Sequence, residues 1–138
     1  MNIIKTSIDG VLILEPRLFR DARGYFFESF SEREFEEKVA PILGHSVHFC
    51  QDNESMSSYG VMRGLHFQRP PYTQSKLVRC VKGRVLDVAV DILKGLPYLW
   101  QACGCRTDRR KSSPVLHSKG LCPWFRSPLR NSSLPIQV

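Results

Sequence analysis

Residues 84–92, RVLDVAVDI, place an apolar side chain at every second position. The two sets of alternate positions are Leu86, Val88, Val90 and Ile92 on one side and Val85, Asp87, Ala89 and Asp91 on the other. A period of two indicates a β-strand. Lys82-Gly83 just upstream suits a tight turn, so residues 76–92 are predicted to form a β-hairpin. A chain built around this stretch must form a sheet with at least one covered face.

Further strand-like segments lie upstream of this stretch. GVLILEP at 10–16 is a short apolar run that ends in proline, and RGYFFESF at 23–30 is rich in aromatic residues. HSVHFCQDNESMS at 45–57 begins with alternation and then becomes polar. Because short strands dominate, the sequence predicts an all-β antiparallel sandwich or barrel. At 138 residues the chain suits one domain.

One short helix is predicted near residues 31–40, within SEREFEEKVAPIL. Ser31 suits the N-cap, and Glu34 three positions later completes a capping box. Pro41 is expected to limit the length of the helix. The predicted apolar stripe consists of Phe35, Val39 and Ile42.

The pattern ends after Gly95. Residues 96–138 have no sustained period of two or 3.6 and are rich in proline, serine, arginine and cysteine. The net charge is +1 over residues 1–95 and +6 over residues 96–138, so the basic character of the chain belongs to the second segment. As written, that segment is predicted to be a disordered basic tail. An alternative function is a non-enzymatic partial β-domain whose tail binds nucleic acid or an anionic surface.

Residues 60–76, GVMRGLHFQRPPYTQSK, bring together Arg63, His66 and Lys76 without an acidic residue among them. Histidine titrates near neutrality and is the usual general base. A neighbouring cation can stabilise an oxyanion or bind a phosphate. This combination suits proton abstraction next to a carbonyl group. Spacing alone favours an ordinary surface histidine and strand lysine, so the hypothesis needs further support.

Metal binding has little support in the spacing of the possible ligands. No second histidine lies within two residues of His66, and His45 and His48 have no acidic residue beside them. The set Cys103, Cys105, His117 and Cys122 fits no common zinc motif. The cysteine count of five is odd and the spacing is scattered, which argues against a disulfide framework. The sequence therefore predicts no metal site.

Two long stretches are more specific than any single motif. VLILEPRLFRDARGYFFESF at 11–30 and QDNESMSSYGVMRGLHFQRPPYTQSKLVRCVKGRVLDVAVDI at 51–92 together resemble the dTDP-4-dehydrorhamnose 3,5-epimerase family. The resemblance implies a cupin-like jelly roll, also called a double-stranded β-helix, a homodimer, and no cofactor or metal. It also implies epimerisation at C3 and C5 of dTDP-4-dehydro-6-deoxy-D-glucose, giving dTDP-4-dehydro-L-rhamnose in dTDP-L-rhamnose biosynthesis.

The same resemblance assigns roles to individual residues. His66 matches the base that removes the C3 and C5 protons, and Lys76 matches the cation that stabilises the enolate oxygen at C4. The residues that match substrate contacts are Arg23, Glu28, Gln51, Asp52, Asn53 and Arg63. In the family the contacts matching Arg23 and Glu28 can come from the dimer partner. The cations face a diphosphate and an enolate, so they need no acidic partners nearby.

The family's tyrosine acid and its GFAHGF segment have no match in this sequence. If the DNA behind the tail is read one base later, HSKGLCPWF at 117–125 can become IPRGFAHGF. RSPLRNSSLPIQV at 126–138 can become AVLSETAVFLYKC, which supplies a tyrosine. We therefore expect a one-base insertion near the codon of Gly95. The chain as written is expected to be a truncated, inactive epimerase that lacks the strands closing the barrel.

The N-terminal residues MNIIKTSIDGV lack a basic region followed by an apolar core, as a secretion signal would have. No apolar run approaches the length of a membrane span. The sequence therefore predicts a cytoplasmic protein without a membrane partner. Under the resemblance, nucleic acid is not a partner either.

Overall fold

The computed structural model describes residues 1–93, 95, 99–108, 112–118, 121–126 and 132–137. Twelve strands and two short helices follow one another in this part of the chain. Their bounds are β1 Asn2–Lys5, β2 Val11–Glu15, β3 Phe19–Asp21, β4 Gly24–Phe26, α1 Glu32–Lys38, α2 Ala40–Leu43, β5 Asp52–Ser57, β6 Met62–Arg63, β7 Lys76–Val78, β8 Arg84–Asp91, β9 Ala102–Asp108, β10 Val115–His117, β11 Leu121–Arg126 and β12 Ser132–Gln137.

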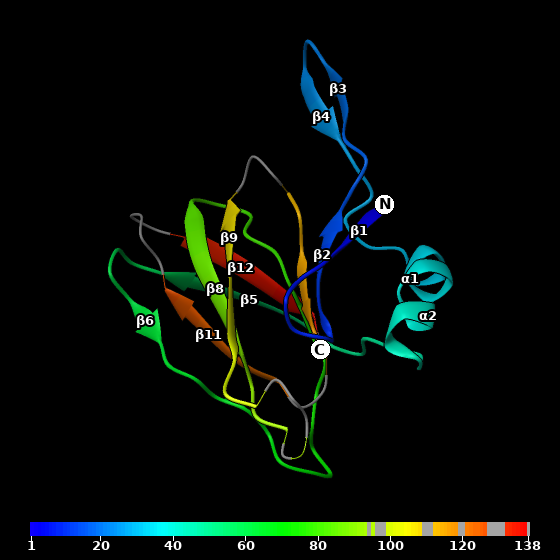
Figure 1. The fold of residues 1–138 in the computed structure, drawn as a ribbon. Helices are drawn as coiled ribbons and strands as arrows, with labels where there is room; N and C mark the ends of the chain where they lie inside the picture. The colour runs from blue at the N-terminus through cyan, green and yellow to red at the C-terminus, as the bar shows by residue number, and fades with distance from the viewer. Residues whose placement is uncertain (94, 96–98, 109–111, 119–120, 127–131, 138) are drawn as a thin grey trace.

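Ten of the strands form two sheets that face each other (Figure 1). The first sheet has the order β1-β2-β10-β7-β12-β5 and the second the order β6-β11-β8-β9. Strands β5-β12-β7-β10 and β6-β11-β8-β9 make up the eight strands of a jelly roll, which β1 and β2 extend at one edge. The predicted all-β jelly roll is therefore confirmed. The described strands include all eight, so the expectation that the closing strands would be missing is wrong.

The predicted hairpin over residues 76–92 is also wrong. Gly83 does form the turn, with a φ of 81° that favours glycine. However, β7 pairs with β10 and β12, whereas β8 pairs with β9 and β11. The chain therefore crosses from one sheet to the other at this turn. A local pattern cannot distinguish a hairpin from such a crossover, because the competing partners lie far along the chain.

Helix α1 confirms the predicted N-cap. The Ser31 side chain accepts a hydrogen bond from the Glu34 amide at 3.4 Å. The carboxylate of Glu34 binds the N-terminal ammonium at 2.6 Å, which ties the start of β1 to the helix. The Glu34 carboxylate also accepts a hydrogen bond from Lys38 Nζ. This bond first, and then the bond from the N-terminal ammonium, hold the pKa of Glu34 below its usual value. Pro41 lies in the first turn of the separate helix α2, where proline is tolerated.

The main apolar core lies between the outer face of the larger sheet and helix α1. It consists of Leu12, Leu14, Phe35, Val39, Val47, Leu77 and Leu116. Ile42, predicted to join this stripe, is 38% exposed and lies outside the core. Burying a side chain of this size contributes about 1.5–3 kcal/mol. Two smaller apolar clusters contribute residues to the space between the sheets, where they lie beside polar side chains: Ile8, Val11, Ala89, Cys105 and Val115 in one, and Val78, Cys80 and Val85 in the other.

The tail differs from the disordered segment expected from the sequence. Its described residues form β9 to β12, and these strands pair with β8, β2, β7, β6 and β5. In β9 the side chains of Cys103, Cys105 and Thr107 are the more buried alternate positions. Because these positions hold cysteine and threonine, the sequence of β9 shows no clear apolar alternation, and the strand was not predicted. In β10, Val115, Leu116 and His117 are all buried.

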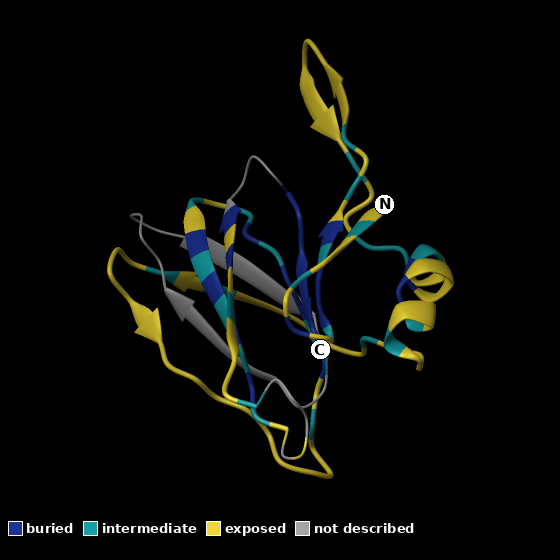
Figure 2. Ribbon diagram, in the orientation of Figure 1, coloured by how far each residue is buried: buried dark blue, intermediate teal, exposed yellow. Residues whose placement is uncertain are grey.

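The β3–β4 hairpin extends away from the sandwich (Figure 1), and it is coloured as exposed in Figure 2. Three of its aromatic side chains are exposed, with Phe19 at 51%, Tyr25 at 46% and Phe26 at 71%. The two strands pair with each other and form a sheet of their own. Neither described helix is long or apolar enough to cross a membrane.

Candidate active site

The strand register shows which residues face the space between the two sheets. His117 of β10 reaches across to Asp87 of β8, with 2.8 Å between Nε2 and Oδ2. Both side chains are buried, at 2% and 1% exposure. Directly paired residues of neighbouring strands point to the same face. The residues in register with these two therefore also face the interior.

Lys76 is one of these interior residues. It is the cross-strand partner of His117 in β7, so its side chain shares the face from which His117 reaches Asp87. Lys76 is half-buried. The predicted enolate-stabilising cation therefore projects into the interior of the jelly roll, on the same side of the sheet as the buried contact between His117 and Asp87.

Arg63 faces the same space from the second sheet. It is in register with residue 125 of β11, which is in register with Asp87. Its guanidinium bridges to the first sheet, with Nε and Nη2 3.2 and 3.1 Å from Ser57 Oγ, and it donates to the Met56 carbonyl at 3.3 Å. Since β5 and β6 are the edge strands of their sheets, Arg63 lies at the β5–β6 edge of the sandwich, hereafter the mouth.

The polar segment before and within β5 lines the same mouth. Asn53 is in register with residue 136 and, through it, with the inward-facing Val78. Gln51 donates to Asn53 Oδ1 at 2.9 Å. Asp52 is in register with position 137, which is in register with Leu77. Leu77 belongs to the apolar core on the outer face of the sheet, so Asp52 is on that outer face. Of the three predicted residues, Asn53 faces the interior, Gln51 contacts it, and Asp52 points to the other face.

His66 lies on the loop from β6 to β7, three residues after Arg63. Every residue from 61 to 70 is exposed. The His66 Nδ1 lies 2.9 Å from the Gly64 carbonyl oxygen. A carbonyl only accepts, so Nδ1 is the donor and the neutral ring keeps its lone pair on Nε2. This is the tautomer that a general base needs. The loop joins Arg63 at the end of β6 to Lys76 at the start of β7, and among the described residues His66 forms a hydrogen bond to neither of them.

Arg23 and Glu28 are not brought to the interior of this chain. Arg23, at the turn of the β3–β4 hairpin, is 91% exposed and pairs with Asp21 at 2.6 Å. The Arg23 guanidinium and its backbone N–H hold the pKa of Asp21 below the usual value. Glu28 is also exposed, just after the hairpin. Arg23 therefore belongs to a projecting arm, and Glu28 lines a pocket on the outer face of the larger sheet with Phe35 and Leu77.

Asp87 and His117 are interior polar residues that the sequence analysis did not select. The alternation of β8 was visible in the sequence, but the fully apolar set of alternate positions is not the set that is most buried. The most buried positions are Val85, Asp87, Ala89 and Asp91. Two aspartates on one alternate face of an otherwise apolar strand were the available signal. Buried carboxylates are rare unless paired, so such a face favours a functional interior over a simple core.

A jelly roll with a lysine, a buried aspartate and a buried histidine facing the space between its sheets is typical of proteins that bind a small polar molecule. The sequence model of the dTDP-4-dehydrorhamnose 3,5-epimerase family matches residues 5–128. The chain belongs to this family, whose members are isomerases. The match extends beyond Gly95, into the segment with strands β9 to β11.

Individual relatives agree with this assignment. The dTDP-4-dehydrorhamnose 3,5-epimerase of Shigella flexneri is 59% identical over 125 residues, which is 91% of this chain and 67% of the relative. The Escherichia coli enzyme is 61% identical over 92 residues, 67% of this chain and 48% of the relative. The chain thus spans about half to two thirds of the length of these curated relatives.

Solved structures share the fold over nearly the whole chain. The epimerase from Elizabethkingia anophelis has a TM-score of 0.90 and 36% identity, covering 99% of this chain and 73% of its own. A dTDP-6-deoxy-D-glucose-3,5-epimerase from Legionella pneumophila, in complex with dTDP-4-keto-L-rhamnose, has a TM-score of 0.89 and 38% identity, covering 99% and 70%. Because the superposition includes the tail, β9 to β12 occupy the places of strands in these relatives.

Proposed function

We propose that this chain binds dTDP-4-dehydro-6-deoxy-D-glucose between its sheets and has the residues for proton abstraction at C3 and C5. The observation that supports this best is that Lys76 and Arg63 both face the space between the sheets, from opposite sheets. Two cations in one polar interior suit a substrate with a diphosphate and a ketone that becomes an enolate. The reaction proposed is that named for the relatives.

The chemistry follows from the ketone at C4, which acidifies the protons on both neighbouring carbons. His66 Nε2 accepts the proton, because Nδ1 donates to Gly64. The ammonium of Lys76 stabilises the charge that forms on the C4 oxygen. Arg63, with Gln51 and Asn53 at the mouth, binds the polar part of the substrate. The mechanism uses neither metal nor cofactor.

Inversion also needs an acid that delivers a proton to the opposite face of the ring. The tyrosine that the resemblance implies has no match in this sequence. With only one proton-transfer group, the base returns a proton to the face from which it removed one. The chain is therefore proposed to exchange the C3 and C5 protons with solvent while retaining configuration, and to be inactive as an epimerase.

Proton exchange gives a direct test of the proposed base and cation. In D₂O the chain should incorporate deuterium at C3 and C5 of the substrate, read by NMR, without forming the L-rhamno product. We expect His66→Asn and Lys76→Met each to slow exchange by about 10²–10⁴-fold, the usual contribution of a positioned catalytic group. Exchange no faster than in buffer would reject the proposal.

His45→Asn is the matched control for His66→Asn. His45 is exposed, and its Nδ1 lies 3.1 Å from the Leu43 carbonyl, two residues back, as in His66. It follows the C-cap of helix α2 and matches no catalytic or substrate-binding residue, so this variant should leave the exchange rate unchanged. If both histidine variants slowed exchange equally, His66 would have no special role.

We also infer that two copies of the chain assemble through the β3–β4 arm. The arm exposes Phe19, Tyr25 and Phe26 outside the body of the subunit. Large exposed aromatic side chains on a projecting segment favour a protein partner. A second copy is the partner proposed, because Arg23 and Glu28 match substrate contacts, yet Arg23 lies on this arm and Glu28 faces a pocket outside the larger sheet, so neither faces the interior of its own chain.

The arm can be tested by sedimentation velocity of the full chain. Phe26→Ser removes the most exposed of the arm's three aromatic groups and is expected to convert a dimer to a monomer, or to weaken the dimer by at least about tenfold (1.4 kcal/mol). Trp100→Ser is the control, since Trp100 is 73% exposed but lies at the β8–β9 turn. A dimer lost equally in both variants, or kept in the Phe26 variant, would contradict the inference.

The origin of residues 96–138 remains a separate proposal. We propose that they are translated one base out of frame, which accounts for their basic charge and for the missing tyrosine. The proposed compartment is the cytosol, and Cys50, Cys103 and Cys105 are free thiols, as suits a reducing compartment.

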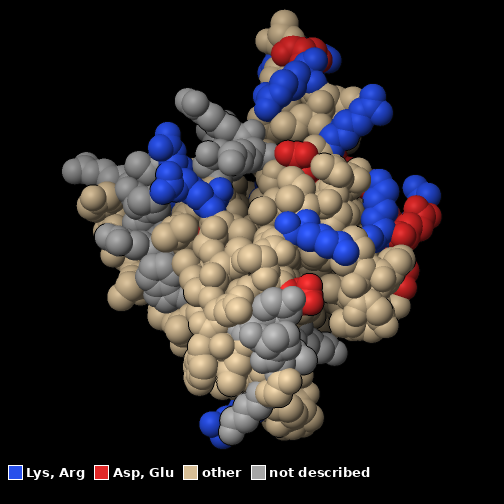
Figure 3. All heavy atoms as spheres, in the orientation of Figure 1, with Lys and Arg blue, Asp and Glu red and all other residues tan. Residues whose placement is uncertain are grey.

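No observation favours the alternative of a basic arm that binds nucleic acid. On the face seen in Figure 3, the described lysines and arginines stand in separate groups, several beside acidic residues. A nucleic-acid site needs a continuous basic stripe or patch. The described part of the tail also pairs within the sandwich and is not a free arm.

A further inference from the structure

Cys103-Gly104-Cys105 in β9 places two thiols on one face of a strand. Cys103 is in register with Ala89 and Cys105 with Asp87, so both thiols face the space between the sheets. Both cysteines are free, Cys105 is buried and Cys103 is half-buried. The pair therefore forms a preorganised dithiol whose second sulfur is partly accessible.

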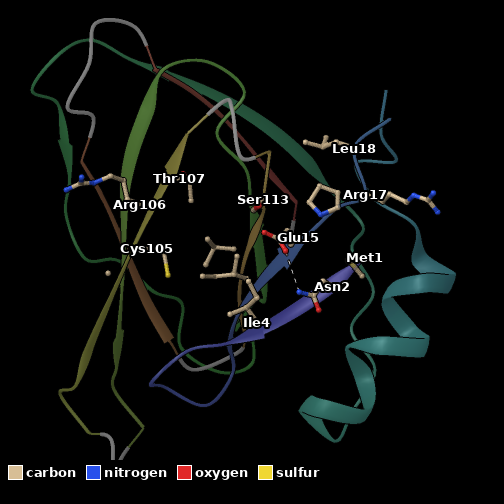
Figure 4. Close-up of a pocket in the computed structure, with 14 residues that line it drawn as sticks. Met1, Asn2, Ile4, Glu15, Arg17, Leu18, Cys105, Arg106, Thr107 and Ser113 are labelled. Atoms are coloured by element: carbon tan, nitrogen blue, oxygen red, sulfur yellow. Dashed lines mark hydrogen bonds between the residues drawn. The ribbon is translucent and has the colours of Figure 1, made fainter. Parts of the chain in front are cut away.

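A cavity adjoins this dithiol. It has a volume of about 760 Å³ and lies between β9 and strands β1, β2 and β10. Apolar residues line much of it, including Ile4, Ile13 and Val115. Figure 4 shows the Cys105 sulfur directed into it, whereas the side chains of Arg17 and Arg106 point away. The cavity thus favours a small apolar group over an anion.

The environment of the thiols decides which thiol-seeking ligand is favoured. Burial, followed by the neighbouring Cys103, raises the pKa of Cys105 to about 12. A divalent metal requires deprotonated thiolates and is therefore disfavoured at neutral pH. Among the described residues there is also no group of three or more histidine, cysteine or acidic side chains that could hold a metal.

A disulfide between the two cysteines is disfavoured by the strand itself. Residues i and i+2 of a strand have Cα atoms about 6.6 Å apart, near the upper limit for a disulfide. Their side chains stand side by side and do not converge, so closing a direct S–S bond requires the strand to distort. A larger atom that bridges the sulfurs avoids this distortion.

We propose that Cys103 and Cys105 form a binding site for trivalent arsenicals that bear a small aryl group. An aryl arsenoxide forms two As–S bonds with the two thiols and loses its oxygen as water, which takes both thiol protons. Arsenic remains trivalent and no charge is separated, so a protonated Cys105 is no obstacle. The aryl group occupies the cavity beside Cys105. The site does not depend on the proposed epimerase chemistry.

Phenylarsine oxide is the probe for the test. The full-length chain is incubated with it in excess glutathione, which removes arsenic from single thiols, and intact mass should show one adduct per chain. The remaining thiols are then alkylated, the arsenical is released with dimercaptopropanol, and the freed thiols receive a second label. Trypsin yields residues 95–106 as one peptide, which contains Cys103 and Cys105 and no other cysteine. Both new labels are expected there.

Matched variants separate the dithiol from ordinary thiol reactivity. Cys103→Ser and Cys105→Ser should each weaken arsenical binding by about 10²–10⁴-fold, because a second attachment point contributes a factor of that order. Cys50→Ser and Cys80→Ser should retain the adduct. No adduct on the native chain, labels on another peptide, or an adduct kept in Cys103→Ser would overturn the proposal. The peptide map of the native chain holds even where a variant fails to fold.

Discussion

Deleting one base close to the codon of Gly95 is expected to produce an active epimerase from a chain that we propose to be inactive as written. The restored frame supplies a tyrosine as the missing proton donor, while His66 and Lys76 remain unchanged. A positioned general acid contributes about 10²–10⁴-fold to rate. We therefore expect formation of dTDP-4-dehydro-L-rhamnose to rise by at least that factor, measured on both proteins with the same substrate.

The constraint behind this expectation is strict. When a reading frame shifts by one base, two bases of each new codon are already fixed by neighbouring residues, and only the former third position is free. Under that constraint residues 117–125 can still encode IPRGFAHGF and residues 126–138 can encode a tyrosine-lysine pair, both as the family requires. An unrelated sequence would satisfy two such segments only by chance.

Resequencing the DNA across the codons for residues 92–96 supplies the control. If the extra base is absent from the gene, the frame-restored protein is the natural one. If the extra base is present and the frame-restored protein is no more active than the chain as written, the proposed shift is wrong. The tail would then be a genuine set of strands, and the donor for inversion would have to come from elsewhere.

Local features of this fold could be predicted from the sequence, whereas long-range pairing could not. The Ser31 cap depends on a residue three positions away, and the turn at Gly83 on its own conformation, so both were accessible. The destination of β8 depends on β9 and β11, whose residues gave no alternating apolar pattern. The predicted hairpin was therefore wrong, and the strands of the tail were not predicted, because neither depends on a local apolar pattern.

The residues of the candidate site also fall into those that the sequence indicated and those that only the fold shows. Lys76, Arg63 and Asn53 were selected through the resemblance, and the register places them around one space. Asp87 was visible as one of two aspartates on alternate positions, but its partner lies 30 residues further along the chain. Only the fold shows that it meets His117 across the sheets. Sequence reasoning finds such a pair only when it also knows which face is buried.

Asp87→Ala is expected to destabilise the chain by about 3–5 kcal/mol, as the loss of one partner from a buried pair usually does. The substitution leaves His117, 2% exposed, without the carboxylate that lies 2.8 Å from it. Urea unfolding at neutral pH measures the loss. The double variant Asp87→Leu with His117→Leu removes both polar groups and should recover most of the stability, since a well-packed apolar pair is often as stable as a buried ion pair.

The same substitution has a different expected outcome in the frame-restored protein, because position 117 becomes isoleucine there. Asp87 would then lose the histidine nitrogen that lies 2.8 Å from its carboxylate. Asp87→Ala should therefore cost far less stability in the restored chain than in the chain as written. An equal cost in both proteins would mean that Asp87 is held by other contacts, and that the His117 pair does not stabilise the sandwich.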